Sequence, residues 1–318
     1  MKRFLPDNFT LAMIATVILA SLLPCTGQGA VIFNDITRVA VALLFFLHGA
    51  KLSREAVIAG ITHWRLHLLV LLLTFALFPL LGLLLKPLLQ PLITPDLYLG
   101  ILFLCMLPST VQSSIAFTSA ARGNVPAAVC SASASNLLGI FLTPMLVGLL
   151  TTAQMKGDSK MDSVLQIGTQ LLLPFIAGQV ARRWIGAWVE QHKPLTRIVD
   201  QGSILLVVYT AFSEAVGQGL WHQVSWATLG GLLLINVVLL GLVMFISAQA
   251  ARRLGFSRED RIAIVFCGSK KSMASGVPMA KVLFAGGALG AVVLPLMLFH
   301  QMQLMVCAVL AQRYAKQA

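Results

Sequence analysis

Two adjacent lysines lie inside an apolar part of the chain, and they are the residues best placed to do chemistry. Lys270 and Lys271 interrupt the stretch "FCGSKKSMASG" (266–276), which has apolar runs on both sides. A charged side chain near the centre of a bilayer costs about 2.5–3.5 kcal/mol on insertion scales, so such residues usually serve a function. An ammonium at this depth could attract an anion or take the place of a bound cation.

The depth of the pair argues against a purely structural role. A lysine near the end of a membrane segment can extend its amine to the interface, and Lys281 is placed to do so. Lys270 and Lys271 are about half a membrane span from Arg261, at about 1.5 Å per helical residue. Neighbouring helical residues also point about 100° apart, so the two amines can hardly reach one interface. We expect one of the two lysines to face an internal cavity, and we favour Lys270.

A second polar interruption occupies the corresponding place in the first half of the chain. There "LCMLPSTVQSSIAFTSAARGN" (104–124) is interrupted at Pro108, as the later segment is at Gly268. Paired Gly or Pro breaks in the two halves of a membrane protein are the best sequence indication of a transporter's binding site. The polar candidates for this site are Ser109, Thr110, Gln112, Ser113 and Ser114 at the first break, and Gly268, Ser269, Lys270, Lys271 and Ser272 at the second.

A break in a membrane helix has chemical consequences. An unwound turn frees N–H and C=O groups that lipid cannot satisfy, so it persists only inside protein or beside a wet cavity. Exposed N–H groups at a half-helix favour anions, and exposed carbonyls favour cations. The next helix contains "CSASASN" (130–136), which puts Ser131 and Ser135 on one face and ends in Asn136. The serines of this stretch, Ser131, Ser133 and Ser135, either join the site or serve close helix packing, as small polar residues often do.

The composition indicates an integral membrane protein. Of the 318 residues, 58% are hydrophobic and 11% are charged, whereas a soluble domain carries about 25% charged residues. The net charge of +12 is expected from cytoplasmic loops and not from nucleic-acid binding. Five scattered cysteines favour apolar packing over a metal site or disulfides, and no cofactor is expected. The histidines lack ligand spacing, and HExxH, P-loop and nucleophile-elbow motifs are absent, so we predict that the protein is not an enzyme.

Ten apolar segments have the length of membrane helices, or nine if one of the shorter ones does not cross. A spanning helix needs about 20 largely apolar residues. The segments are 8–24, 34–50, 65–85, 97–120, 125–151, 162–182, 198–217, 225–250, 259–284 and 287–312. A signal peptide is the alternative for "MKRF" and the apolar stretch after it, which we interpret as the first helix. With both termini inside, most of the 23 lysines and arginines fall on the cytoplasmic side of a bacterial inner membrane.

The ten segments divide into two halves of five. The chain midpoint lies in the polar stretch "AQMKGDSKMDS" (153–163), between the fifth and sixth segments. Because five is odd, the second half must insert upside down relative to the first. We therefore predict an all-α polytopic protein of two inverted repeats, 1–158 and 159–318. The similar starts of the second helix in each half, "TRVAVALL" (37–44) and "TRIVDQGS" (196–203), are in keeping with this repeat.

Three stretches together carry a resemblance to a known family. They are "LPSTVQSSIAFTSAARGN" in the fourth segment, "LFFLHGAKLS" (44–53) in the second and "LFHQ" (298–301) in the tenth. In order and spacing the chain resembles the sodium/bile-acid symporter superfamily, and in particular its SBF-like bacterial subgroup of sodium-dependent transporters. The resemblance covers essentially the whole chain.

The resemblance implies a fold and an activity. The family fold has ten helices in two inverted repeats, with a panel domain of helices 1, 2, 6 and 7 and a core domain of helices 3–5 and 8–10. The broken helices 4 and 9 cross in the core domain, and one domain moves against the other to give alternating access. The implied activity is the transport of a small organic anion, such as a bile acid or a steroid sulfate, through the lipid bilayer with sodium.

The chain departs from the family pattern where the relatives bind sodium. Their ninth-helix Glu-x-Gly-x-Gln-Asn reads Phe266 to Lys271 here, so the glutamate is absent and two lysines replace the amides. The fourth-helix Asn of the relatives is Ser114, and their third-helix Gln is Thr74. Thr74, His48, His300 and Gln301 are further candidates for lining the cavity. Sodium needs oxygen ligands, so a site with two lysines and no acid should reject it.

These departures lead to a hypothesis and to two alternatives. A lysine ammonium stands where relatives bind a cation, and a proton instead of sodium serves as the coupling ion. The first alternative is a membrane regulator that has a transporter fold and no transport activity; a sealed crossover without a cavity would favour it. The second is a sodium-coupled symporter with a rearranged ion site. Glu214 is the one carboxylate considered as a partner for the lysines.

Overall fold

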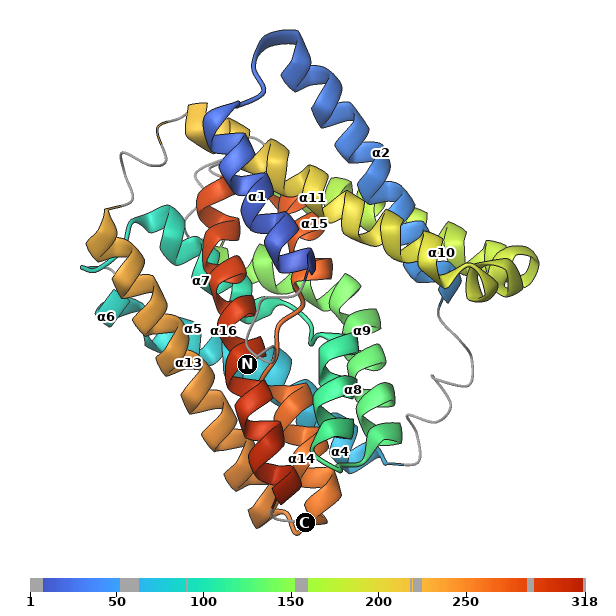
Figure 1. Ribbon diagram of the computed structural model, residues 1–318, viewed down its shortest axis with the longest axis vertical. Coiled ribbons are helices and arrows are strands. Elements are labelled where there is room, and N and C mark those ends of the chain that lie inside the picture. The colour runs from blue at the N-terminus through green and yellow to red at the C-terminus, as the bar shows by residue number, and fades with distance from the viewer. Residues whose placement is uncertain are drawn as a thin grey trace. The chain divides into compact units, whose positions relative to one another are not determined.

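The structure is helical throughout the part of the chain that it describes. The computed structural model describes residues 8–51, 63–89, 91–151, 160–217, 219, 225–284 and 289–316, and this part contains no β-strand (Figure 1). Its contacts divide the chain into two compact units. Unit 1 comprises Met1–Leu52, Gly148–Ser225 and Val277–Val293, and unit 2 comprises Ser53–Val147, Trp226–Gly276 and Leu294–Ala318.

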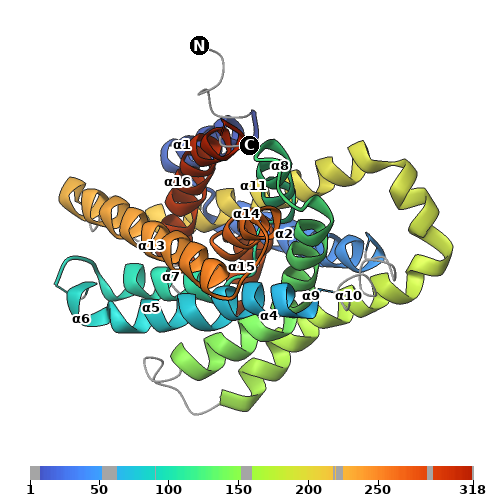
Figure 2. The same cartoon turned by 90° about the horizontal axis from the view of Figure 1, so that it is seen from below.

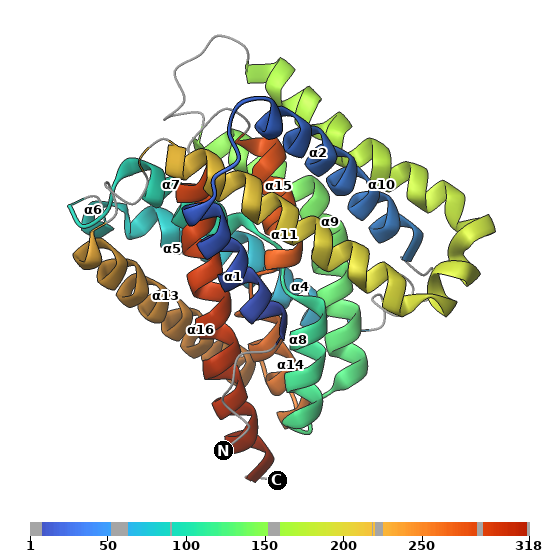
Figure 3. The same cartoon turned by 45° about the horizontal axis from the view of Figure 1, so that its top comes forward.

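Unit 1 is built from four long helices, α1 (Asn8–Leu22), α2 (Gly27–Lys51), α10 (Lys160–Gln191) and α11 (Lys193–Gly217). Helices α2 and α10 run side by side (Figure 3). They approach so closely that a Cβ atom at Gly49 would collide with the Phe175 carbonyl, and one at Gly178 with the Phe46 carbonyl. Small residues are what allow membrane helices to pack backbone against backbone.

Polar contacts connect the same helices. The Lys51 ammonium lies 2.7 Å from the Asp200 carboxylate, which joins α2 to α11. The Tyr209 hydroxyl donates to the Leu23 carbonyl over 2.9 Å at the end of α1. Unit 1 is therefore held together by the close pair α2–α10 and by side-chain bonds of α11.

Unit 2 contains the remaining helices, except for the end of α9 (from Gly148), most of α15 (from Val277) and the start of α16 (to Val293), which belong to unit 1. A nearly continuous rod is formed by α4 (Trp64–Leu72), the π-helical turn η1 (Leu73–Leu77) and α5 (Phe78–Leu84). The other helices are α6 (Lys86–Leu89), α7 (Pro95–Met106), α8 (Val111–Ala120), α9 (Val125–Thr151), α13 (Trp226–Arg253), α14 (Arg258–Gly268), α15 (Met273–Leu283) and α16 (Leu289–Lys316). Helix α14 packs against α4, α8 and α13 (Figure 2), and its buried face includes Ile264 and Cys267.

Both helix breaks predicted from the sequence are present. Helices α7 and α8 meet at an angle of 61° across residues 107–110. Pro108 explains this break, because the residue before a proline is driven out of the helical region, and Leu107 has φ −76° and ψ 154°. Helix α14 ends at Gly268, and α15 begins only at Met273.

Each of the ten predicted segments coincides with a helix or with a broken helix pair, but fewer of them meet the criteria for spanning. Six helices of the described part are long and apolar enough to cross a membrane, and the bent pair α7–α8 makes a seventh. The six are α2, Trp64–Leu84, α9, α11, α13 and α16. The chain is thus a multi-pass membrane protein, and ten spans in inverted repeats remain a prediction. The predicted repeat boundary at 158/159 and both termini lie outside the described residues.

The α2–α10 contact predicts that Gly178→Ala destabilises unit 1. The added methyl group would meet the Phe46 backbone, and such overpacking costs about 1–3 kcal/mol. Gly202→Ala in α11 is the control, since nothing lies within 4 Å of a Cβ atom there and alanine is the better helix former. Thermal unfolding of purified protein in detergent should show a lower midpoint for Gly178→Ala alone. Equal midpoints for the two variants would contradict the contact.

Candidate functional site

The two helix breaks of unit 2 bond directly to each other. The Ser109 hydroxyl donates to the Cys267 carbonyl over 2.6 Å, and the Thr110 hydroxyl donates to the Lys271 carbonyl over 2.8 Å. In the other direction, the Ser272 amide donates to the Pro108 carbonyl over 2.8 Å. Each break therefore satisfies backbone groups that the other leaves free, as irregular backbone inside a membrane requires.

The ammonium of Lys271 fills its hydrogen-bonding capacity with main-chain carbonyls. It donates to the carbonyl oxygens of Thr74 and Cys105 over 2.8 Å and of Leu107 over 2.7 Å. The Lys271 side chain is fully buried, and its Nζ lies 4.0 Å from the centre of the Phe78 ring. An ammonium has three N–H donors, and all three are used.

The positions of these carbonyls explain why they attract a cation. Cys105 and Leu107 belong to the C-terminal end of α7, where the last carbonyls of a helix carry partial negative charge. Thr74 lies in the π-helical turn η1, and such turns often occur at functional sites. Two helix irregularities thus direct carbonyl oxygens at one point, and Lys271 supplies the positive charge there.

A glutamine that is absent from the sequence-based candidates holds the backbone of Lys271. The Gln303 side-chain oxygen accepts the Lys271 amide over 2.9 Å, and its nitrogen donates to the Lys271 carbonyl over 3.0 Å. The same nitrogen lies 2.9 Å from Nδ1 of His300. Gln303 is fully buried in α16. The available signal was a second glutamine in "FHQMQL", three residues after His300, whereas the resemblance pointed to the neighbouring Gln301.

Lys270 is as deeply buried as Lys271, but its surroundings differ. Its Nζ lies 3.9 Å above the Phe117 ring and 5.7 Å from the centre of the Phe266 ring. Among the described residues this nitrogen has no hydrogen-bond partner. A desolvated cation–π contact is worth about 2 kcal/mol, which is less than three hydrogen bonds to carbonyls. That Lys270 faces a cavity stays a prediction from the sequence. Lys271 is the lysine whose ammonium contacts main-chain carbonyls.

Three further predicted residues, Ser114, Ser135 and Asn136, brace the two breaks. The Ser109 amide donates to the Ser135 hydroxyl over 3.0 Å, and the Ser114 hydroxyl donates to the Phe266 carbonyl over 3.1 Å. The Asn136 amide donates to the Ser109 carbonyl, and its oxygen accepts the Ser275 hydroxyl over 2.7 Å. Helix α9 therefore connects the first break to the start of α15 through Ser135 and Asn136.

The side chains of several predicted residues make contacts other than those that join the two breaks. The Ser269 hydroxyl returns to the Val265 carbonyl of its own helix over 2.6 Å, and the Ser272 hydroxyl lies 3.1 Å from that of Ser275. Ser131 bonds to Nδ1 of His67 over 2.7 Å. A Cβ atom at Gly268 would lie 2.8 Å from a Leu73 methyl group, so this glycine permits close packing of α14 on η1.

The remaining predicted residues lie outside this hydrogen-bond set or touch it indirectly. Gln112 is exposed, and the buried Ser113 hydroxyl has no hydrogen-bond partner in the described part. The Thr74 hydroxyl donates to the Val70 carbonyl. Thr74 therefore contributes only its backbone carbonyl oxygen to the site. Gln301 is half-buried in α16. His48 belongs to unit 1, where its ring centre lies 6.2 Å from that of Phe45.

No carboxylate contacts either lysine within the described part of unit 2. Glu214, the acid considered as a partner from the sequence, belongs to unit 1. The charge of Lys271 is therefore balanced by peptide dipoles, and that of Lys270 by aromatic rings. The described residues also contain no cluster of three histidine, cysteine or acidic side chains that could hold a metal ion.

The contrast between the lysines predicts opposite effects of one substitution. Lys271→Met leaves three buried carbonyls without donors, at about 1–3 kcal/mol each, so it should lower the thermal midpoint clearly. Lys270→Met removes an ammonium whose burial no hydrogen bond offsets, so it should leave the midpoint unchanged or raise it. Tryptophan fluorescence during heating of the purified variants measures both. A loss that is as large for Lys270→Met as for Lys271→Met would contradict this assignment.

Comparison with known proteins identifies the family to which the chain belongs. The model of the SBF-like CPA transporter family (DUF4137) matches residues 7–316. A Pseudomonas aeruginosa protein, "Uncharacterized protein PA2026", is 70% identical over 314 residues, which cover 99% of this chain and 94% of the other. An Escherichia coli protein named "Putative symporter YfeH" is 56% identical over 318 residues, covering 100% and 96%.

Vertebrate relatives are more distant and extend over nearly the same length. The rat "Sodium/bile acid cotransporter 7" is 30% identical over 320 residues, covering 98% of this chain and 93% of the other. The family and the relatives named as symporter and cotransporter are transporters and not enzymes, as the sequence predicted. The chain belongs to the SBF-like CPA transporter family, within the bile acid:sodium symporter superfamily.

Proposed function

We propose that this membrane transporter moves a small organic anion by alternating access, and that the ammonium of Lys271 takes the place of a coupled sodium ion. The observation that carries the proposal is the set of three carbonyls around the Lys271 ammonium. Carbonyls at unwound turns and helix C-termini are the groups with which transporters of this kind coordinate sodium. In this chain a covalently attached cation occupies them.

A bound ammonium opposes sodium at the same place for two reasons. It uses the carbonyl oxygens that a sodium ion would need. It also repels a second cation, because two unit charges about 4 Å apart interact with about 4 kcal/mol at an effective dielectric constant of about 20. We therefore propose that a proton, rather than sodium, is the coupling ion.

The division of the chain into two units supports an alternating-access mechanism. Unit 1 holds α1, α2, α10 and α11, which are the predicted helices 1, 2, 6 and 7 of a panel domain. Unit 2 holds most of the remaining helices and both breaks, as expected of a core domain. In this proposal the repeats 1–158 and 159–318 supply five helices each, and both termini face the cytoplasm of a bacterial cell.

An organic anion is the proposed substrate class. Helix α8 begins directly after the first break and α15 directly after the second, so each presents N-terminal amides that favour negative charge. The names of the vertebrate relatives refer to bile acids. We propose a bile-acid-like or steroid-sulfate-like molecule that approaches the breaks near Gln112 and Ser113.

A second candidate function is a regulator with a transporter fold and no transport activity. The observation that favours it is the closure of the site, since Ser109, Ser114, Ser269, Lys270 and Lys271 have 0% of their surface exposed. A transporter in an occluded conformation would have the same burial. The two candidates differ in whether purified protein moves any solute.

Transport in proteoliposomes tests the proposal. Purified protein should accumulate taurocholate or estrone sulfate under an imposed pH gradient, with equal uptake in sodium and in choline buffers. Uptake that depends strictly on a sodium gradient would show that the chain is a sodium symporter with a rearranged ion site. Folded protein that moves no anion under either gradient would support the regulator.

A further inference from the structure

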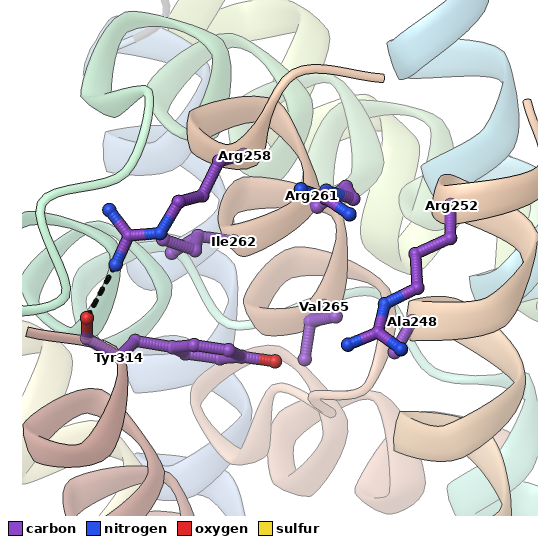
Figure 4. A pocket seen from close by; sticks show the side chains of 7 residues that line it. All are labelled: Ala248, Arg252, Arg258, Arg261, Ile262, Val265 and Tyr314. Carbon is purple, nitrogen blue, oxygen red and sulfur yellow. Dashed lines mark hydrogen bonds between the residues drawn. The ribbon is translucent and has the colours of Figure 1, made fainter. Parts of the chain in front are cut away.

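A cluster of arginines in unit 2 surrounds a small cavity that is separate from the helix breaks. The cavity has a volume of about 110 Å³. Arg252 of α13, Arg258 and Arg261 of α14, and Tyr314 of α16 line it, so three helices contribute to its wall (Figure 4). Val265 is one of the apolar residues that complete it.

The cavity is partly preformed. Arg258 is held in place because its guanidinium donates to the Tyr314 carbonyl over 2.6 Å. The Tyr314 hydroxyl and the Arg252 guanidinium point toward each other from α16 and α13, with Val265 between them (Figure 4). The Tyr314 ring is itself packed edge-on against Phe266, with ring centres 6.1 Å apart.

The positive charges of the cavity are not neutralised. Arg252 and Arg261 make no hydrogen bond or ion pair with the residues that the structure describes. The acidic residues of the same helix turn do not line the cavity. Asp260 accepts the Asn124 side-chain amide over 2.7 Å instead, and Glu259 is exposed. The positive-inside rule explains the sign of these charges, but it does not explain why arginines of two helices converge on one cavity.

We infer that this cavity binds the phosphate group of a ligand. Arginine guanidinium groups match phosphate oxygens with paired hydrogen bonds, and a tyrosine hydroxyl can donate a further one. The volume suits a phosphate group and not a steroid, since sites for organic ligands usually measure about 300–1,000 Å³.

Two ligands would supply such a phosphate group: the headgroup of an anionic lipid, or free inorganic phosphate. Either would offset part of the positive charge of the three arginines and join α13, α14 and α16. Helix α14 also carries Gly268 and leads directly into the lysines of the second break. Occupation of the cavity would thus fix the helix that positions Lys271, whatever the identity of the transported solute.

The melting temperature of the protein reports the binding of inorganic phosphate and of an anionic lipid headgroup alike. We expect inorganic phosphate to raise the melting temperature of the detergent-solubilised protein by about 2–4 °C relative to chloride at equal ionic strength. We expect a similar rise in phosphatidylcholine nanodiscs when phosphatidylglycerol is added. Stabilisation by phosphatidylglycerol alone identifies a lipid headgroup as the ligand, and stabilisation by both shows that the phosphate group suffices.

Matched variants connect the effect to the cavity. The double variant Arg252→Gln/Arg261→Gln should show no rise in melting temperature with phosphate. The single variant Arg252→Gln, at an exposed position, should need at least tenfold more phosphate for the same rise. Arg253→Gln is the control, because Arg253 lines a different surface groove with Phe245 and Gln249. The inference is overturned if neither form stabilises the wild type, or if Arg253→Gln loses as much stabilisation as Arg252→Gln.

Discussion

The buried ammonium of Lys271, with three main-chain carbonyls around it, is the interaction on which the rest of unit 2 depends. A helix break inside a membrane leaves carbonyls that neither water nor lipid can satisfy. Here two irregular places, the end of α7 and the turn η1, direct such carbonyls to one point, and the second break delivers a cation to them. The lysine and the breaks therefore require each other, since either alone would be costly to bury.

Other features of the site follow from this requirement. Gln303 holds both backbone groups of Lys271, and Ser109 and Thr110 of the first break fix the loop from the other side. The neighbouring Lys270 lacks such bonds, because its ammonium lies beside aromatic rings and has no carbonyl partner in the described part. The arginine cavity lies at the opposite end of the same helix α14. One short helix thus lines the arginine cavity and leads at its C-terminus into the loop that carries Lys271.

The sequence predicted the features that depend on residue type. Pro108 and Gly268 indicated the positions of the breaks, and the apolar runs indicated the helices. The ligands of Lys271 could not be predicted, because these are peptide carbonyls that every residue has, and only the bend of α7 and the π-helical turn select them. Nothing in the sequence pattern distinguishes the two neighbouring lysines, so the preference for Lys270 over Lys271 had no structural basis. Gln303 was missed because a glutamine in an apolar helix resembles a packing residue until its partner is known.

Sodium binding after removal of the Lys271 side chain tests the central claim most directly. In Lys271→Ala the three carbonyls would be left around an empty space, and we predict that sodium chloride raises the melting temperature of this variant relative to choline chloride. The wild type and Lys270→Ala should show no difference between the two salts. A sodium-dependent rise in the wild type equal to that in Lys271→Ala would show that the lysine does not stand in for the ion.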